Sequence, residues 1–352
     1  MKTTLGCIAL VCFAGSPLHT DYAKDRSFRV EHRLHCTTET TQVEIEVDGE
    51  PQEVPDGSRP KTSSTYAWSF TDRVLAVDEA RPSKVRRHFE SVEGKSTRTM
   101  NGEEREDEMP TPFDGLTVEL TRDGDDVKVD VIEGKKPEHD GALSGHRLEL
   151  PLDAFLPLAA VEKGATWELD SDAVRGALGL ALHAAYFPRP SAEEAPSEGG
   201  EGRGRRGRTG QMSRMSARNI LAQMEWSGTA ELAEKLEEID GVECVKITLE
   251  LRAQGEVADA APEGAGGRQP RAFTPSTRGP AALESTYDAE LEGALYFAVE
   301  SKLPVRLELA GKLALESNRE STRGERTIRM RSKSEGEIEI RVDIAETKSE
   351  EK

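Results

Sequence analysis

The sequence predicts an all-β protein with a minor helical part: a largely antiparallel, strongly bent sheet or open half barrel with one or two packed helices. Three observations lead to this expectation. Apolar and polar residues alternate along many segments, Asp-Gly pairs join some of these segments, and helices are predicted in only two short stretches. With 352 residues the chain is long enough for one large β domain or two ordinary ones.

Several segments alternate apolar and polar residues with the period of a β-strand. In the segment FRVEHRLHC, Phe28, Val30 and Leu34 share one side, and the alternation continues in VEIEV (43–47). The segment GEIEIRVDI (336–344) alternates isoleucine or valine with charged residues. One apolar side and one charged side are typical of antiparallel strands that bury a single face.

Three hairpins are predicted where alternating segments are joined by turn residues. Two of the turns are Asp-Gly pairs, which supply the positive φ angles that a tight hairpin requires. The predicted hairpins are 116–131, turning at Asp123-Gly124; 226–251, turning at Asp240-Gly241; and 291–315, turning at 301–304. In the last hairpin Gly311 interrupts a long strand, which indicates a bulge or a bend.

Helices are predicted at SDAVRGALGLALHAA (171–185), with a capping residue at Asp170 or Ser171, and at SRMSARNILAQM (213–224). Leu232, Leu236 and Ile239 also fit a helix, but the Asp-Gly pair that follows them favours the hairpin. Three tracts are unpatterned and cannot bury enough apolar surface to offset the entropy of ordering: 93–112, 188–210 and 259–282. We therefore expect a β-rich half at 24–187, a disordered linker at 188–212, and a second β-rich half at 213–347 with a flexible loop at 257–283.

The amino terminus indicates export. Residues 1–16 combine Lys2, an apolar run and small residues after it, which is the layout of a signal peptide. The alternative is a buried N-terminal strand or helix. Neither Cys7 nor Cys12 has the context that lipid attachment needs, and no later segment has the roughly 18 apolar residues of a membrane helix. We expect a protein of the bacterial periplasm or cell envelope without a transmembrane segment.

Loss of a signal peptide leaves two cysteines, Cys36 and Cys244. In an oxidising compartment they have two possible states, a disulfide that joins the two halves or two separate thiols. Cys36 falls on the apolar side of its strand pattern, whereas Cys244 falls on the polar side of its own. This mismatch favours two separate thiols.

The tract EGGEGRGRRGRTG contains the spacing G-x-G-x-x-G at 202–207. A dinucleotide-binding fingerprint needs a strand before the glycines and a helix after them, and neither is predicted here. The favoured interpretation is a solvated tether in which glutamates screen arginines. A further hypothesis is contact with an anionic envelope polymer or lipid headgroup, made by the arginines of the tract: Arg203, Arg205, Arg206 and Arg208.

No other pattern indicates catalysis, a cofactor or a metal. His32 and His35 are three residues apart on a strand, which places them on opposite faces and disfavours a shared metal ion. The acidic residues form no recognisable pair for acid–base chemistry. The net charge of −19 opposes nucleic acid as a partner, because phosphates would be repelled by most of the surface.

Several stretches have a resemblance to exported, β-rich bacterial proteins of unknown function. The residues that carry it are a G-x-x-W strand start at Gly164 and Trp167, and a strand of the form L-x-G-x-L-x-F from Leu291 to Phe297. The long alternating strands are also loosely similar to periplasmic half-barrels that carry lipid or lipoprotein acyl chains. That second resemblance implies a concave binding surface.

These observations lead to a functional hypothesis with two alternatives. The expected function is that of an exported, non-enzymatic protein, acting as a binding or structural component of the cell envelope. The first alternative is a periplasmic carrier that holds a lipid or other apolar ligand on a concave sheet. The second is a hydrolase with an unrecognised acidic site.

Overall fold

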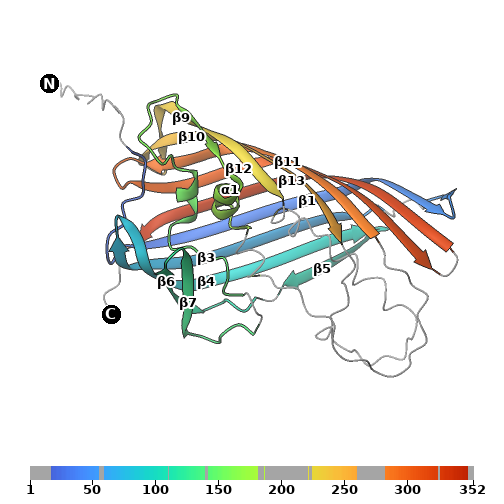
Figure 1. The fold of residues 1–352 in the computed structure, drawn as a ribbon, viewed down its shortest axis with the longest axis horizontal. Helices are drawn as coiled ribbons and strands as arrows, with labels where there is room; N and C mark the ends of the chain where they lie inside the picture. The colour runs from blue at the N-terminus through green and yellow to red at the C-terminus, as the bar shows by residue number, and fades with distance from the viewer. Residues whose placement is uncertain are drawn as a thin grey trace, which may run out of the picture.

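A computed structural model describes residues 17–54, 59–109, 111–138, 142–180, 186, 221, 224–259, 282–323 and 326–347. Within these residues thirteen strands form one antiparallel sheet (Figure 1). Its order is β7-β6-β4-β3-β1-β13-β12-β11-β10-β9-β8, with β2 paired to β1 and β5 paired to β4. Because β7 and β8 end this order without pairing to each other, the sheet is open, and the predicted fold class is confirmed.

The strands that cross the middle of the sheet are long. Twenty-one residues of β1 extend over about 70 Å at the usual rise of a strand. The strands are β1 (Ser27–Val47), β2 (Glu50–Gln52), β3 (Lys61–Asp78), β4 (Arg81–Met100), β5 (Glu103–Met109), β6 (Thr117–Asp123), β7 (Asp126–Glu133), β8 (Thr166–Leu169), β9 (Glu225–Ile239), β10 (Val242–Asp259), β11 (Ala282–Ala298), β12 (Leu303–Arg323) and β13 (Arg326–Thr347).

The two β-rich halves of the sequence contribute to this single sheet. Strand β1 pairs with β13 along its whole length, from Ser27 opposite Thr347 to Val47 opposite Ile328. The predicted signal peptide (1–16) and linker (188–212) lie outside the described residues. Strand β10 reaches Asp259 and β11 begins at Ala282, so both extend into the segment predicted as a flexible loop.

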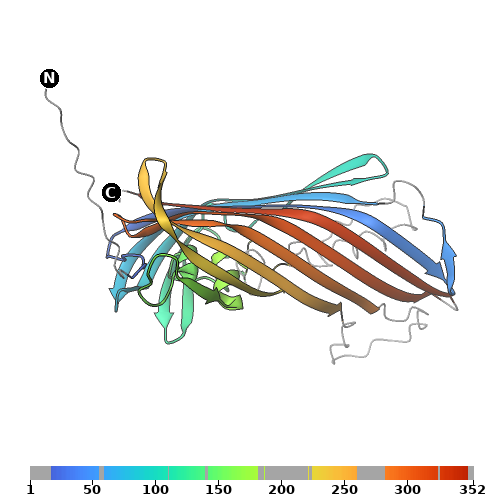
Figure 2. The same ribbon diagram turned by 90° about the horizontal axis from the view of Figure 1, so that it is seen from above.

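The sheet has an inner face, on which the helix α1 (Ser171–Ala177) lies (Figures 1 and 2). The short 3₁₀ helix η1 (Pro151–Phe155) packs beside α1. The outer face carries mainly charged and polar side chains, as β1 and β13 show. The predicted alternation is confirmed, since Phe28, Val30 and Leu34 are buried between exposed arginine residues. In β13, Ile338, Ile340, Val342 and Ile344 are likewise buried. The apolar core therefore lies between the inner face and the two helices.

The first predicted helix is confirmed over Ser171–Ala177, and residues 181–185 of the predicted stretch lie outside the described residues. Its N-cap is Asp170, whose side chain accepts a hydrogen bond from the Ala173 amide at 2.7 Å. The helix ends at Ala177, and Gly179 follows with φ of +64°. A Cβ at Gly179 would lie 2.9 Å from the Trp68 ring, so this glycine also allows close packing on the sheet. Nearly all of the second candidate helix (213–224) lies outside the described residues.

The three predicted hairpins are present, with two corrections. The third turns at 299–302 and not at 301–304, because Leu303 and Pro304 already pair with Ala298 and Phe297. Asp240 and Gly241 have φ of +51° and +83°, as expected for their turn. At the β6–β7 turn only Gly124 takes a positive φ. Asp123 is instead the last paired residue of β6, opposite Asp126, so the turn residues are 124 and 125.

The prediction that 93–112 is unpatterned was wrong. Strand β4 continues to Met100, and β5 returns along it from Glu103. The turn between them is Asn101-Gly102, with φ of +56° and +78°. All but one of the side chains of β5 are exposed, so no apolar alternation marks it, and the Asn-Gly pair was the overlooked signal.

Glycines on the inner face allow the sheet to bend. A Cβ at Gly293, Gly311 or Gly336 would lie within 1.9 Å of a carbonyl oxygen on the neighbouring strand. Such an approach is impossible for any other residue, which is how glycine bends a strand in a coiled sheet. Gly311 keeps its register with Leu291 and Ile338, so it marks a bend and not a bulge.

Gly311→Ala is expected to lower the free energy of unfolding by about 1–3 kcal/mol, because its Cβ would lie 1.8 Å from the Glu290 carbonyl oxygen. Gly255→Ala on β10 is the matched control. The nearest atom to its Cβ is the Cα of Met224 at 3.7 Å, an ordinary contact, so this variant should be as stable as the parent or slightly more so. Urea unfolding followed by circular dichroism measures both. Equal stability of the two variants would contradict the close approach.

Candidate functional site

The described residues contain a fully buried ion pair between β3 and β4. Arg87 donates to both carboxylate oxygens of Asp72, at 2.7 and 2.8 Å, and its guanidinium lies 4.0 Å from the Phe70 ring centre. Arg87 also donates to His146 Nδ1 at 3.2 Å and to the Arg147 carbonyl at 3.3 Å. Both charged side chains are 2% exposed, so this cluster fastens a loop to the sheet and is closed to substrates.

A second carboxylate, half-buried, holds the start of the described chain. Asp153 in η1 accepts hydrogen bonds from the Thr20 and Tyr22 hydroxyls. The Tyr22 oxygen in turn accepts from the Leu150 amide at 2.7 Å. Burial raises the pKa of Asp153 to about 6, although the two hydroxyls lower it. The segment before β1 is thereby tied to the elements that cover the inner face.

The histidines of β1 lie on opposite faces, as predicted. His32 is buried and stacks on Trp68 with ring centres 3.9 Å apart, whereas His35 is on the outer face and contacts Thr65. Nε2 of His32 donates to the Leu178 carbonyl at 3.0 Å. In the part of the chain that the structure describes, no group of three or more histidine, cysteine or acidic residues is placed to hold a metal ion.

The two cysteines are free thiols, and both are buried. Three strands separate β1 from β10 in the sheet, so Cys36 and Cys244 lie four strand spacings apart, roughly 19 Å. Disulfides need Cα atoms within about 7 Å. Burial raises the pKa of Cys36 to about 12. Burial also raises the pKa of Cys244, although the nearby charge of Arg306 lowers it.

The arginines proposed to contact anions, Arg203, Arg205, Arg206 and Arg208, lie outside the described residues.

Beyond the core, the inner face changes from aliphatic residues to hydroxyl groups. These side chains form hydrogen bonds across neighbouring strands: Thr40 with Ser334 at 3.0 Å, Ser64 with Ser96 at 3.0 Å, and Ser317 with Ser332 at 2.8 Å. We name these six residues the hydroxyl belt. Because the hydroxyls form hydrogen bonds with one another, their partial burial carries a low desolvation cost. The hydroxyl belt separates the core from the far end of the inner face.

Past the hydroxyl belt the inner face becomes apolar again. Ile45 lies opposite Met330, and Val47 lies opposite Ile328, so these side chains share one face. They are half-buried and do not belong to the core cluster. Among the described helices, α1 and η1 lie toward the other end of the sheet (Figure 1). We name this surface the distal patch: Val43, Ile45, Val47, Ile328 and Met330.

The outer face carries a groove at the opposite end of the sheet. The tip of the β9–β10 hairpin, yellow in Figure 2, rises from the outer face there. A groove of about 370 Å³ lies between this tip and the ends of β1, β12 and β13. Its aliphatic lining is Ile239, Val242, Leu303, Val305 and Ile344, and its charged lining is Arg29, Glu31, Asp240, Arg306, Asp343 and Glu346.

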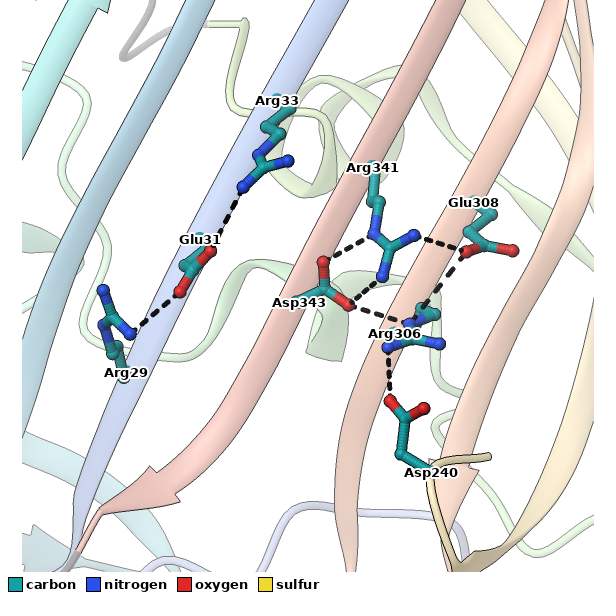
Figure 3. A network of polar contacts seen from close by, with 8 residues as sticks. All are labelled: Arg29, Glu31, Arg33, Asp240, Arg306, Glu308, Arg341 and Asp343. Carbon is teal, nitrogen blue, oxygen red and sulfur yellow. Dashed lines mark hydrogen bonds and ion pairs between the residues drawn. The ribbon is translucent and has the colours of Figure 1, made fainter. Parts of the chain in front are cut away.

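Ion pairs fix the charged wall of the groove (Figure 3). Arg306 contacts Asp240 of the hairpin tip at 2.6 Å and Asp343 of β13 at 2.8 Å. Arg341 contacts the other oxygen of Asp343 at 2.7 Å. Burial raises the pKa of Asp343, but hydrogen bonds from Arg341 and Arg306 outweigh it, so the pKa is lowered. Hydrogen bonds to Asp343 raise the pKa of Arg306 and of Arg341, so the charged forms of these three groups stabilise one another.

No family model matches the chain, and no curated protein is similar to it. None of the described helices is long and apolar enough to cross a membrane.

The sequence prediction missed both surfaces, although one left a signal. In RMRSKSEGEIEI, Met330, Ser332 and Ser334 share the parity of Ile338, so they belong to the face that the core residues occupy. Following that parity outward predicts the hydroxyl belt and the distal patch. The groove has no such signal, because its lining comes from four segments that only the folded chain brings together.

Proposed function

We propose that this protein is an exported, non-enzymatic binding protein of the bacterial cell envelope, and that it holds a lipid or similar elongated apolar molecule on the inner face of its sheet. One observation carries the proposal. The distal patch presents half-buried aliphatic side chains on the inner face, while the outward residues of the same strands are charged. A contiguous apolar surface outside the core is typical of a binding surface.

The chemistry of the two zones supports an amphiphilic ligand. Aliphatic side chains of the distal patch would contact acyl chains, while the hydroxyl belt offers donors and acceptors to an ester or headgroup oxygen. The bend of the sheet follows from the inner-face glycines and gives this face its concave form. The carboxylates of Asp72 and Asp343 are each paired with an arginine, Arg87 and Arg306, which supports a structural role for these two groups over acid–base catalysis.

The experiment measures lipid on the full-length mature protein. Native mass spectrometry of protein purified from a bacterial envelope is expected to show bound lipid, and a pyrene-labelled phosphatidylglycerol is expected to bind to the delipidated protein. The variant Ile45→Asn/Met330→Gln should weaken probe binding about tenfold or more, because two facing apolar contacts are lost. Its urea unfolding should match that of the parent, since both side chains lie outside the core.

The matched control is Glu44→Gln/Arg331→Gln, a facing pair one residue away on the outer face. This variant should bind the probe as the parent does. Absence of both co-purified lipid and probe binding would overturn the proposal. Equal affinity of the two double variants would also overturn it, because binding would then not depend on the inner face.

A further inference from the structure

The groove on the outer face is a second surface, independent of the proposed lipid site. Val242 is 41% exposed and is one of four large apolar residues in the described part of the chain with such exposure. It lies in the groove beside the half-buried Ile239 and Val305. A volume of about 370 Å³ falls within the range of small binding sites, roughly 300–1,000 Å³. The groove can therefore accept one or two side chains of a partner.

The charge of the groove is negative. Its lining has four carboxylates and two guanidinium groups, a net charge of −2. Five further residues form ion pairs with this lining, three of them arginines and two glutamates, which leaves −1. The charges also differ in accessibility: the Asp240 side chain is 76% exposed, whereas the Arg306 side chain is 19% exposed and held by two carboxylates. Among the charged lining side chains Asp240 is the most exposed, and Arg29 and Glu346 follow at 45% each.

The hairpin tip forms one wall and is fastened at a single charged contact. Asp240 contacts Arg306, and the Val299 amide bonds to the Glu243 carbonyl at 3.2 Å. A cavity of about 10 Å³ lies farther along the same hairpin, lined by Leu232, Leu236 and Val245 among others.

We infer that the groove is a docking site for a partner protein, which inserts a segment that combines aliphatic and basic side chains. The aliphatic side chain packs on Ile239, Val242 and Val305, and the basic group pairs with Asp240 or Glu346 at the rim. A polypeptide fits better than a small molecule because the groove is open to solvent, so the backbone of an inserted segment stays hydrated. Charge complementarity gives the contact its specificity.

The test uses labelled synthetic peptides and the full mature chain. Fluorescence anisotropy compares a peptide of alternating lysine and valine with one of alternating glutamate and valine and one of alternating lysine and serine. The lysine–valine peptide is expected to bind at least about tenfold more tightly than either of the others. Val242→Arg fills the groove with a positive charge and should weaken this binding about tenfold or more.

The control variant is Ile132→Arg on β7, which makes the same change in net charge at a residue 46% exposed and away from the groove. It should bind the lysine–valine peptide as the parent does, which separates the groove from general attraction to an acidic protein. Equal weakening in both variants overturns the inference. Direct binding of dodecylammonium, measured by calorimetry, without any binding of the lysine–valine peptide also overturns it, in favour of a small amphiphile. Lipid binding should be unchanged in Val242→Arg, so failure here leaves the proposed function standing.

Discussion

Acidification is expected to lower the free energy of unfolding between about pH 6.5 and pH 3, and two buried histidines should account for most of the loss. Burial lowers the pKa of His32 and of His146 to about 3, and the charge of Arg87 lowers that of His146 further. In the unfolded chain a histidine titrates near pH 6.5. The stability that the neutral rings contribute is present above pH 6.5 and is lost as the pH falls toward 3, because only the unfolded chain then binds protons.

The free energy of unfolding is expected to fall by up to about 1.4 kcal/mol per pH unit for each histidine. Over the whole interval this is about 5 kcal/mol for each histidine. His32→Gln keeps a donor toward the Leu178 carbonyl, and His146→Asn keeps an acceptor toward Arg87. Each variant should lower the stability at neutral pH and flatten its dependence on pH. Urea unfolding at a series of pH values measures both effects.

His35→Gln is the control, because this histidine lies half-buried on the outer face of the same strand, away from the core. Its pH dependence should match that of the parent. Asp153 acts in the opposite direction: its pKa is raised, so its contribution is present below about pH 4 and is lost as the pH rises through 6. A parent stability that stays flat or rises from pH 6 to pH 4, with no change in slope for either histidine variant, would contradict the prediction.

The alternation of the sequence predicts the strands because a single buried face imposes a period of two along each of them. Phe28 to Leu34 and Ile338 to Ile344 show that this period holds in both halves. The order of the strands in the sheet does not follow from this period, because any two amphipathic strands can pair. Strands β1 and β13 are more than 270 residues apart in sequence, and they pair only because both contribute side chains to the same core.

Strand β5 is not predicted by the period-two alternation. It buries no face against the core, so its residues do not alternate, and only the Asn101-Gly102 turn indicates a hairpin there. The β1 strand shows a second limit, since its register shifts between Thr40 and Gln42. This bulge reverses the parity, and without it Val43 and Ile45 would point outward. The distal patch therefore depends on an irregularity that composition does not reveal.

The sequence predicts that Asp72 and Arg87 are buried, but not that they pair with each other. Asp72 falls in register with Phe70 and Val74, and Arg87 falls in register with Val85 and Phe89. Each charge thus interrupts an apolar side and predicts a buried polar group. That the two groups neutralise each other follows only from the pairing of β3 with β4, which places them directly opposite.

Breaking this pair is expected to have a large effect on stability. Asp72→Asn leaves Arg87 as a buried cation without a counter-charge, and Arg87→Met leaves a buried carboxyl without its two donors. Each change should lower the free energy of unfolding by about 3–5 kcal/mol. The double variant should lose less than the sum of the two, because it removes both charges together.

The neighbouring pair provides the control. Arg73 contacts Asp25 at 2.8 Å, a similar separation, but both side chains are exposed to solvent. Arg73→Met should change the free energy of unfolding by less than about 1 kcal/mol, because water already compensates the two charges in either state. Urea unfolding of the four variants at neutral pH tests the contrast. If Arg87→Met costs no more than Arg73→Met, or if the double variant loses the full sum, the two groups do not act as a coupled buried pair.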